Sequence, residues 1–178
     1  MPAPNSNIEL PAGLNQRYEV RSKVGRGASG TVYQAWDTFA QREVALKIAH
    51  AHIFNDDPDQ NLIRKAWLNE VHLAGSLHHP YIIDIYDAGF GENCAYLVME
   101  YLAHGTLEPF TKQDNLKPVS EVLNIVYKCA SALDYACRAG IIHRDIKPAN
   151  LQVVGPGEAK VCDFGAAYWS KGNNEATQ

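Results

Sequence analysis

The residues with the clearest potential for chemistry lie in segment 143–150, whose sequence is HRDIKPAN. Asp145 is followed by Lys147 and then by Asn150, with His143 and Arg144 directly before them. The segment follows a run that predicts a helix and precedes a short apolar run that predicts a strand. Because side chains this polar do not all serve packing, the segment is a candidate for chemistry that uses an acid, a lysine and an amide at the end of a helix.

A second motif, GRGASGTV, places glycines at 25, 27 and 30. Glycine is also common in ordinary hairpin turns, so the pattern alone is weak. A dinucleotide-binding turn would lead into a helix, whereas TVYQAW at 31–36 predicts a strand. No Gly-Lys-Ser/Thr follows, which excludes a Walker loop. A glycine hairpin between strands can fold over phosphates because its backbone N–H groups approach without hindrance from a Cβ.

Two more motifs complete the set. Lys47 lies within the apolar strand sequence VALK, where a lysine is usually exposed or extends its charged end to water. A functional lysine there needs an acid to hold it, and Glu70 on the next predicted helix is the candidate. Asp163, Phe164 and Gly165 form the sequence DFG, which by itself is also typical of a turn.

Taken in this order, with these intervening elements, the four motifs resemble the protein kinase family, and most of all the Hanks-type Ser/Thr kinases of bacteria. The resemblance covers residues 18 to about 170. It implies an α+β fold: a small antiparallel β-sheet N-lobe with one helix, followed by the beginning of a mainly helical C-lobe. It also implies an ATP-dependent Ser/Thr protein kinase, with Mg²⁺ as its metal and Mn²⁺ as the alternative ion.

The resemblance assigns roles to the candidate residues. Lys47 would contact the α- and β-phosphates of ATP while Glu70 holds it. Asp145 would accept or orient the proton of the substrate hydroxyl, and Lys147 would neutralise the moving phosphoryl group. The residues assigned to metal binding are Asn150 and Asp163. The residues assigned to nucleotide binding are Val24, Gly25, Arg26, Gly27, Ala28, Ser29, Gly30, Thr31, Val32, Ala45, Lys47, Met99, Glu100, Leu102 and Gln152.

Features within the motifs narrow the implied class. HRD, in place of the HGD of small-molecule antibiotic kinases, favours protein substrates, and Lys147 follows the Ser/Thr pattern. Arg144 marks kinases that are often controlled by a phosphate in the activation segment. Gln152 departs from the family, because an apolar residue usually stands there beneath adenine. An unsatisfied buried amide at Gln152 would cost about 1–3 kcal/mol and weaken nucleotide binding.

The elements that must position these residues follow from periodicity and turn residues. We expect strands over 17–37 around the glycine turn and over 42–50, 81–90, 94–102, 151–154 and 159–164. We expect helices over 56–79, with Leu62, Ala66, Leu73 and Leu77 at helical spacing, and over 120–139. The second helix has Ser120 as the predicted N-cap, Gly140 as the predicted C-cap, and an apolar stripe of Val122, Ile125, Val126, Cys129 and Leu133. The predicted organisation is a flexible lead-in at 1–16, an N-lobe at 17–102 and a partial C-lobe at 103–178 that ends in the activation segment.

The composition of the chain limits the kinds of binding partner and cellular location that we expect. The 178 residues carry a net charge of −4, which argues against a general nucleic-acid binder. We find no secretory signal and no membrane segment in the chain, and expect a cytoplasmic location. The four cysteines (Cys94, Cys129, Cys137 and Cys162) lie at no metal-ligand spacing, and three stand in apolar runs where cysteine is usually a small buried hydrophobe.

The chain stops before an Ala-Pro-Glu motif and a peptide platform, so we expect a fragment of a longer kinase with protein substrates and regulatory domains C-terminal to residue 178. The alternative function is a non-catalytic, pseudokinase-like nucleotide-binding or regulatory module.

Overall fold

The computed structural model describes residues 14–27, 30–49, 67–68, 70–90 and 95–169. The chain divides into two compact units, each built from two separate stretches. The first unit comprises Met1–Trp67 and Ile85–Tyr101, and the second comprises Leu68–Asp84 and Leu102–Gln178.

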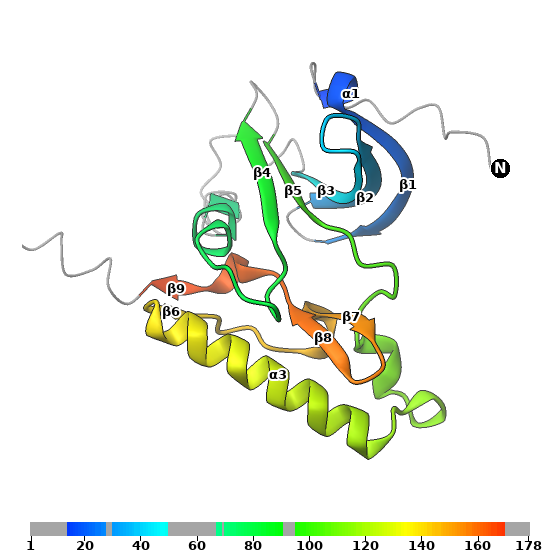
Figure 1. Cartoon of the computed structure of the whole chain (residues 1–178), viewed down its shortest axis with the longest axis vertical. Helices are drawn as coiled ribbons and strands as arrows, with labels where there is room; N and C mark the ends of the chain where they lie inside the picture. Colours follow the sequence, from blue (N-terminus) through cyan, green and yellow to red (C-terminus); the bar gives the residue numbers. More distant parts are fainter. Residues whose placement is uncertain (1–13, 28–29, 50–66, 69, 91–94, 170–178) are drawn as a thin grey trace, which may run out of the picture. The chain divides into compact units, whose positions relative to one another are not determined.

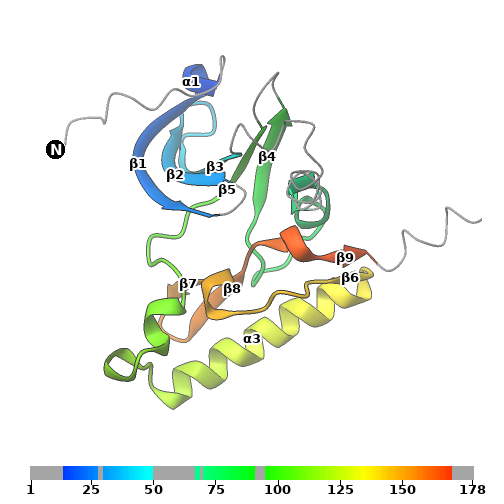
Figure 2. The same ribbon diagram turned by 180° about the vertical axis from the view of Figure 1, so that it is seen from behind.

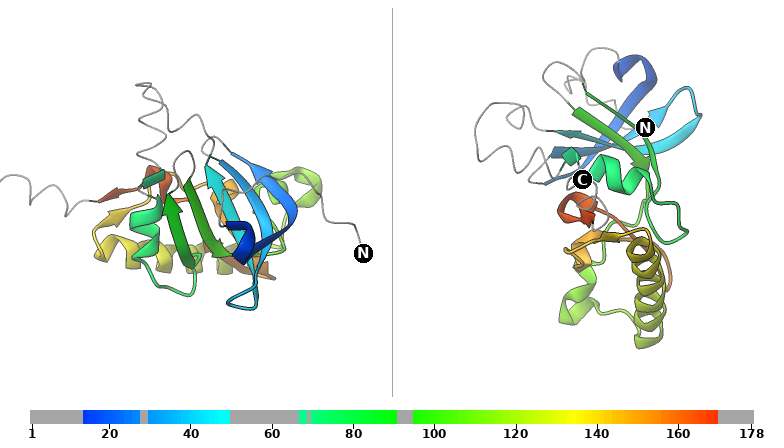
Figure 3. Two further views of the ribbon diagram at one scale, coloured as in Figure 1. Left: turned by 90° about the horizontal axis from the view of Figure 1, so that it is seen from above. Right: turned by 90° about the vertical axis from the view of Figure 1, so that its left-hand side faces the viewer.

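The first unit is built on one five-stranded antiparallel sheet in the order β1-β2-β3-β5-β4. Its strands are β1 (Tyr18–Arg26), β2 (Gly30–Asp37), β3 (Arg42–Ala49), β4 (Ile85–Phe90) and β5 (Ala95–Glu100). They lie side by side when the sheet is seen from above (Figure 3, left). Four consecutive residues of β3, including Val44 and Leu46, are buried, as expected of a central strand. The prediction of a small antiparallel sheet is confirmed.

The core of this sheet reaches back to the short helix α1 (Leu14–Arg17). Leu14 is buried with Tyr18 against Val44, Leu46 and Val98. The side chain of Leu14 removes apolar surface from water at the end of the sheet, which gives α1 a reason to form despite its single turn. The limit predicted for the lead-in, residue 16, therefore falls inside an ordered helix.

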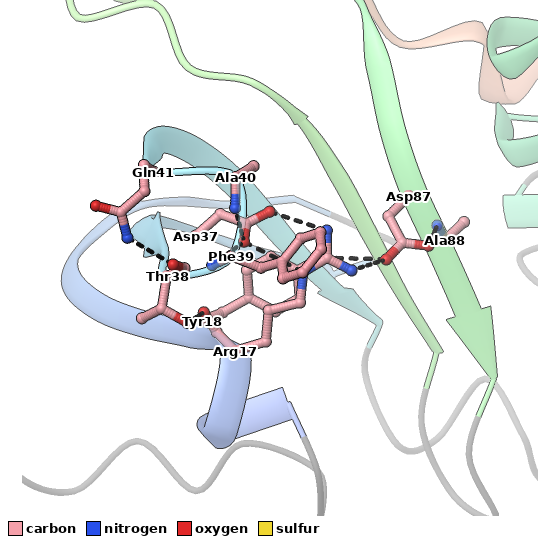
Figure 4. Close-up of polar contacts among 9 residues, drawn as sticks. All are labelled: Arg17, Tyr18, Asp37, Thr38, Phe39, Ala40, Gln41, Asp87 and Ala88. Atoms are coloured by element: carbon pink, nitrogen blue, oxygen red, sulfur yellow. Dashed lines mark hydrogen bonds and ion pairs between the residues drawn. The ribbon is translucent and has the colours of Figure 1, made fainter.

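A polar cluster ties the start of β1 to two other strands of the first unit (Figure 4). The Arg17 guanidinium donates to both carboxylate oxygens of Asp37, at 3.2 and 2.9 Å, and to Oδ2 of Asp87 at 2.9 Å. The Tyr18 hydroxyl donates to the same Asp87 oxygen at 3.1 Å. Burial raises the pKa of the Tyr18 phenol, so the hydroxyl keeps its proton and acts as a donor.

Asp37 is fully buried at the turn between β2 and β3, where its Oδ1 also accepts the backbone N–H groups of Phe39 and Ala40, both at 3.0 Å. Burial by itself pushes the pKa of this carboxyl upward. The hydrogen bonds from Arg17 and from the two N–H groups outweigh it, so the pKa of Asp37 lies below its ordinary value of 3.8. Asp37 is therefore a charged anchor for the hairpin.

Replacing Asp37 by alanine is expected to lower the free energy of unfolding by about 1.5–3 kcal/mol at pH 7, since the charged hydrogen bonds with Arg17 are lost and two backbone N–H groups of the turn lose their acceptor. The control, Glu43→Ala, removes the exposed pair with Arg21 and should cost at most about 1 kcal/mol. Because the pKa of Asp37 is lowered in the folded state, its contribution is complete above pH 3.8 and disappears as the pH falls through the folded-state pKa. Urea titrations at pH 7 and below pH 3 measure both effects; an equal loss for both variants at pH 7 would contradict the anchor.

The second unit contains one long helix and short paired strands (Figures 1 and 2). Its elements are η2 (Glu70–Ala74), η3 (Glu108–Thr111), η4 (Gln113–Asn115), α3 (Val119–Arg138), β6 (Ile141–Ile142), η5 (Pro148–Asn150), β7 (Leu151–Gly155), β8 (Glu158–Val161), η6 (Phe164–Ala166) and β9 (Tyr168–Trp169). β7 pairs with β8, and β6 pairs with β9. The helix α3 packs against β6 and β8.

The long helix differs from its prediction in two respects. Its N-cap is Pro118, without a side-chain hydrogen bond, so the prediction of Ser120 as the cap is wrong. The proline fixes an extended backbone before the first turn, which places the N-cap two residues earlier than predicted. At the other end the C-cap is Ala139, so the prediction of Gly140 as the cap is wrong by one residue. Gly140 directly follows the cap and has φ 85°, a left-handed conformation typical of the glycine that ends a helix.

The buried face of α3 is also displaced from the predicted stripe. Ile125 and Cys129 are buried with Ala132 and Ala136, as helical spacing requires. Val126 is 59% exposed, and the predicted stripe residue Val122 is exposed as well. The helix has apolar residues on more than one side, so its sequence pattern does not select a single face.

Half of the helix predicted over 56–79, including Leu62 and Ala66, lies outside the described residues, while Leu73 and Leu77 are buried as expected. Cys129 and Cys162 are buried, but Cys137 is exposed near the end of α3. Within the described part of the chain, no helix is long and apolar enough to cross a bilayer.

Candidate active site

Segment 143–150 lies between two pairs of strands in the second unit. It begins after β6, which is held by β9, and ends in η5, directly before β7. Arg144 has φ 64°, a left-handed backbone that turns the chain sharply after His143. The Arg144 side chain donates from Nε to the Ala166 carbonyl at 2.8 Å, and its guanidinium lies over the Tyr168 ring. The loop is thereby fastened to the residues that follow the DFG motif.

The buried side chain of His143 packs beneath this loop. Its ring lies 4.6 Å from the ring of Phe164. Nδ1 accepts the backbone N–H of Asp145, which assigns the ring proton to Nε2, and Nε2 lies 3.0 Å from the Cys162 carbonyl oxygen that accepts it. His143 therefore has a structural role: it packs against the DFG phenylalanine and bonds to the loop on one side and to Cys162 on the other.

Asp145, Lys147 and Asn150, the three residues singled out in the sequence, meet at one point. The Lys147 ammonium donates to Oδ2 of Asp145 at 2.7 Å. Nδ2 of Asn150 donates to the same oxygen at 3.0 Å and to the Asp145 backbone carbonyl at 2.8 Å. Two donors therefore orient the Asp145 carboxylate, and both come from residues within five positions of it.

The ionisation of this pair follows from its contacts. The hydrogen bond from Lys147, with a smaller contribution from Asn150, lowers the pKa of Asp145 below its ordinary value. The same hydrogen bond raises the pKa of Lys147, and the charge of Asp163 adds to the effect. At neutral pH the site therefore presents a carboxylate and an ammonium, the forms that accept a proton and attract an anion.

Asp163 stands at the start of η6 with φ 62°. Its Oδ1 accepts the Gly165 N–H at 3.4 Å, which holds the left-handed turn, and its side chain is exposed. The adjacent Phe164 is fully buried against His143, so the motif is anchored on one side and open on the other.

The metal ligands implied by the sequence suit a hard cation. Both hydrogen bonds of the Asn150 side chain use Nδ2, which leaves Oδ1 for an ion, and Asp163 offers carboxylate oxygens. Among the described residues, no three or more His, Cys, Asp or Glu side chains gather into a metal site. Magnesium fits such a sparse set, because it is usually bound by one or two protein oxygens together with substrate phosphates and water.

The glycine hairpin belongs to the first unit and joins β1 to β2. Gly30 is required by packing, because an added Cβ would lie 2.4 Å from the Ile48 carbonyl oxygen. Among the described residues, an added Cβ at Gly25 would meet no atom within 4 Å, and one at Gly27 would meet only the Gly30 carbonyl at 4.0 Å. The described fold does not demand glycine at 25 and 27, which favours the approach of a ligand as the reason for them. Ala28 and Ser29 lie outside the described residues.

The other nucleotide-binding candidates of the first unit gather on neighbouring strands. Val32 on β2 is opposite Lys47 on β3, and Ala45 on β3 is opposite Met99 on β5. Lys47 is only 8% exposed although it carries a charge. The candidates Val24, Arg26 and Thr31 lie on β1 and β2, and Glu100 ends β5.

Glu70, the predicted partner of Lys47, is buried in η2 of the second unit. Because the two residues belong to different units, their ion pair stays a prediction.

Sequence reasoning placed Gln152 beneath the base, and the structure puts it on β7 of the second unit. It is half-buried and forms an isolated antiparallel bridge with Thr106. Nearby, the Val153 N–H donates to the Gly105 carbonyl and the Leu107 N–H donates to the Leu151 carbonyl. The segment after Leu102 is thus tied to β7 within the second unit. Sequence reasoning missed this contact because it joins residues far apart along the chain.

These features together define a protein-kinase-like domain: a five-stranded antiparallel sheet with a glycine hairpin and a central lysine, and a second unit that carries a bonded Asp-Lys-Asn loop beside a DFG turn. The chain belongs to the protein kinase domain family, whose model matches residues 18–178.

Similar curated proteins are bacterial. The chain is 36% identical to a probable serine/threonine-protein kinase of Clostridium acetobutylicum, over 92% of its own length and 24% of that protein. It is 34% identical to the serine/threonine-protein kinase PknB of Mycobacterium leprae, over 96% and 28%. It is 38% identical to the serine/threonine-protein kinase PrkC of Bacillus subtilis, over 86% and 23%. The chain thus spans about a quarter of the length of the curated relatives it matches.

Proposed function

We propose that the chain is part of an ATP-dependent protein kinase that transfers the γ-phosphoryl group of ATP to serine and threonine hydroxyls of proteins. The observation that carries the proposal is the Asp145 carboxylate, partly exposed and held by both Lys147 and Asn150. Phosphoryl transfer asks a protein mainly for positioning and for neutralisation of charge, and these three side chains meet both needs.

Each residue has a definite task in this proposal. Bound ATP and Mg²⁺ supply the phosphoryl group and the charge neutralisation of its oxygens. Asp145 orients the attacking hydroxyl and takes its proton, while Lys147 attracts the transferred anion. Asn150 and Asp163 hold the ion through their oxygens. Lys47 and the N–H groups of the glycine hairpin bind the phosphates.

The substrate class rests on residue type and on the relatives. The relatives reported above are named serine/threonine-protein kinases, and Lys147 stands at the position that the Ser/Thr class uses. A non-catalytic module is the less favoured function, because Asp145, Lys147, Asn150 and Asp163 are all present, and Lys147 and Asn150 both donate hydrogen bonds to Asp145. Among the described residues, Cys129 and Cys137 are free thiols, which supports a reducing, cytoplasmic location.

Nucleotide binding provides the first test. Isothermal titration of the intact protein with a non-hydrolysable ATP analogue is expected to show binding that strengthens at least about tenfold when Mg²⁺ is added, because the ion joins phosphate oxygens to Asn150 and Asp163. Mn²⁺ should substitute for Mg²⁺. Folded protein that binds the analogue equally well with and without either ion would overturn the proposed metal role, and folded protein that binds no nucleotide would overturn the function.

A further inference from the structure

Lys47 is buried in the centre of the sheet, and the first unit places an aromatic ring beside its charge. The ammonium Nζ lies 5.3 Å from the centroid of the Trp67 ring. Trp67 is the largest fully buried side chain among the described residues, with an exposed fraction of 1%. A cation within about 6 Å of an indole face is attracted to it, and the attraction grows when both groups are removed from water.

Trp67 carries an energetic penalty that filling space alone does not explain. Its indole Nε1–H is buried and is the one buried side-chain polar atom in the described part of the chain without a hydrogen-bond partner. An unpaired buried donor is unfavourable, and a phenylalanine would cover much of the same region without one. Indole, however, has the strongest cation-binding face of the aromatic side chains. The ring face therefore offers a reason for tryptophan that packing alone does not.

We propose that Trp67 is a positioning residue that holds the Lys47 ammonium in the orientation needed to bind the phosphates of a nucleoside triphosphate. The proposal rests on the proposed function of Lys47. A lysine side chain that is ordered before the nucleotide binds lowers the entropic cost of binding, and the ring face contributes to that order. Trp67 contacts no reacting atom in this scheme and acts only through Lys47.

The test compares two tryptophans of the same unit. Trp67→Leu removes the ring beside Lys47, whereas Trp36→Leu removes a ring that lies 5.0 Å from the Arg21 guanidinium at the surface of the sheet. In the intact protein we expect Trp67→Leu to raise the Kd of the Mg²⁺-bound ATP analogue by about two- to thirtyfold, the range of a cation–π contact, and Trp36→Leu to leave it unchanged. In a Lys47→Met background, Trp67→Leu should have no further effect.

A second measurement covers the case in which Trp67→Leu does not fold. Tryptophan at 67 can be replaced by analogues with one, two or three ring fluorines, which weaken the face for cations with little change in shape. The Kd should then rise with each fluorine, while Trp67→Phe, which keeps a weaker face and lacks the N–H, should fall between wild type and Trp67→Leu. An equal Kd across the fluorine series would overturn the proposal. So would an effect of Trp67→Leu that is as large in the Lys47→Met background as in the wild type.

A readout without nucleotide separates this proposal from the function on which it rests. A ring face that carries more fluorines attracts the ammonium less, whereas its size and the cover it gives Lys47 hardly change, so an amine-directed acylating reagent should label Lys47 faster with each added fluorine. Faster labelling with no ATP binding by the wild type would contradict the proposed function and keep the contact. If the wild type binds ATP but the labelling rate of Lys47 does not change, the proposed function stands and the positioning role of Trp67 is contradicted.

Discussion

Asp145→Asn is expected to lower the rate of phosphoryl transfer to a serine- or threonine-containing protein about a hundred- to ten-thousandfold, the range for loss of a general base. The asparagine side chain keeps the shape of the aspartate and can still accept from Lys147, so the loop should fold as before. It cannot take a proton from the substrate hydroxyl. The measurement is radiolabelled phosphate transfer from ATP by the intact protein to a generic basic protein.

The matched control for this change is Asp134→Asn on α3, which removes a carboxylate paired with Arg138 on the surface. Its transfer rate should equal that of the wild type. The Kd for the ATP analogue should stay within about twofold in Asp145→Asn, because Asp145 serves the hydroxyl and not the nucleotide. Transfer by Asp145→Asn at the rate of the control would show that Asp145 is not the base.

Asp163→Asn is the change with the second largest expected effect, a loss of about a hundred- to thousandfold in transfer rate at ordinary Mg²⁺ concentration. The position has φ 62°, and asparagine tolerates this left-handed backbone better than other residues with a side chain. The change therefore removes the charge that attracts the cation while it preserves the turn. We expect the Mg²⁺ concentration for half-maximal rate to rise by at least about tenfold, because one anionic ligand is lost.

Asp163→Gly completes this experiment, since glycine accepts the same φ but has no oxygen to offer an ion. Its rate should fall below that of Asp163→Asn at every Mg²⁺ concentration. A transfer rate that depends on Mg²⁺ in the same way in the wild type and both variants would contradict a metal role for Asp163.

The strands of the sheet were predictable because the sequence features that indicate them lie within each strand and the turn beside it. Each of the strands β1, β2 and β3 carries β-branched or aromatic residues and is separated from the next by a recognisable turn. The two-residue strands β6 and β9 carry no periodicity that a sequence could reveal, and their pairing depends on tertiary contacts. In α3, Val126 and Ile125 are neighbours of similar hydrophobicity, yet only Ile125 is buried. Periodicity cannot choose between two apolar faces, because only the packing partner decides.

In the candidate site, too, contacts between residues close in the chain could be predicted, whereas contacts between distant residues could not. Asp145, Lys147 and Asn150 are close in the chain, so their spacing was enough to predict that they act together. The link from Arg144 to Ala166 and the ring of Trp67 beside Lys47 join distant residues. Arginine at 144 shows no sign in the sequence of its left-handed backbone, and a tryptophan in an apolar helix is expected to be core. These contacts depend on the tertiary structure, so no pattern in the sequence predicts them.

The first unit is built from two separate stretches of the chain, and this affects how it can fold while the ribosome is still synthesising it. β1, β2 and β3 form a consecutive meander that can pair as soon as it emerges, but Val44 of β3 pairs with Glu100 of β5 only after a long intervening stretch has been made. Until then β3 is an open edge, with Leu46 and Ile48 among the residues that still await their partners on β5. A nascent chain at this stage is most exposed to aggregation and to chaperones, so the speed of translation between β3 and β5 should govern the yield of folded protein.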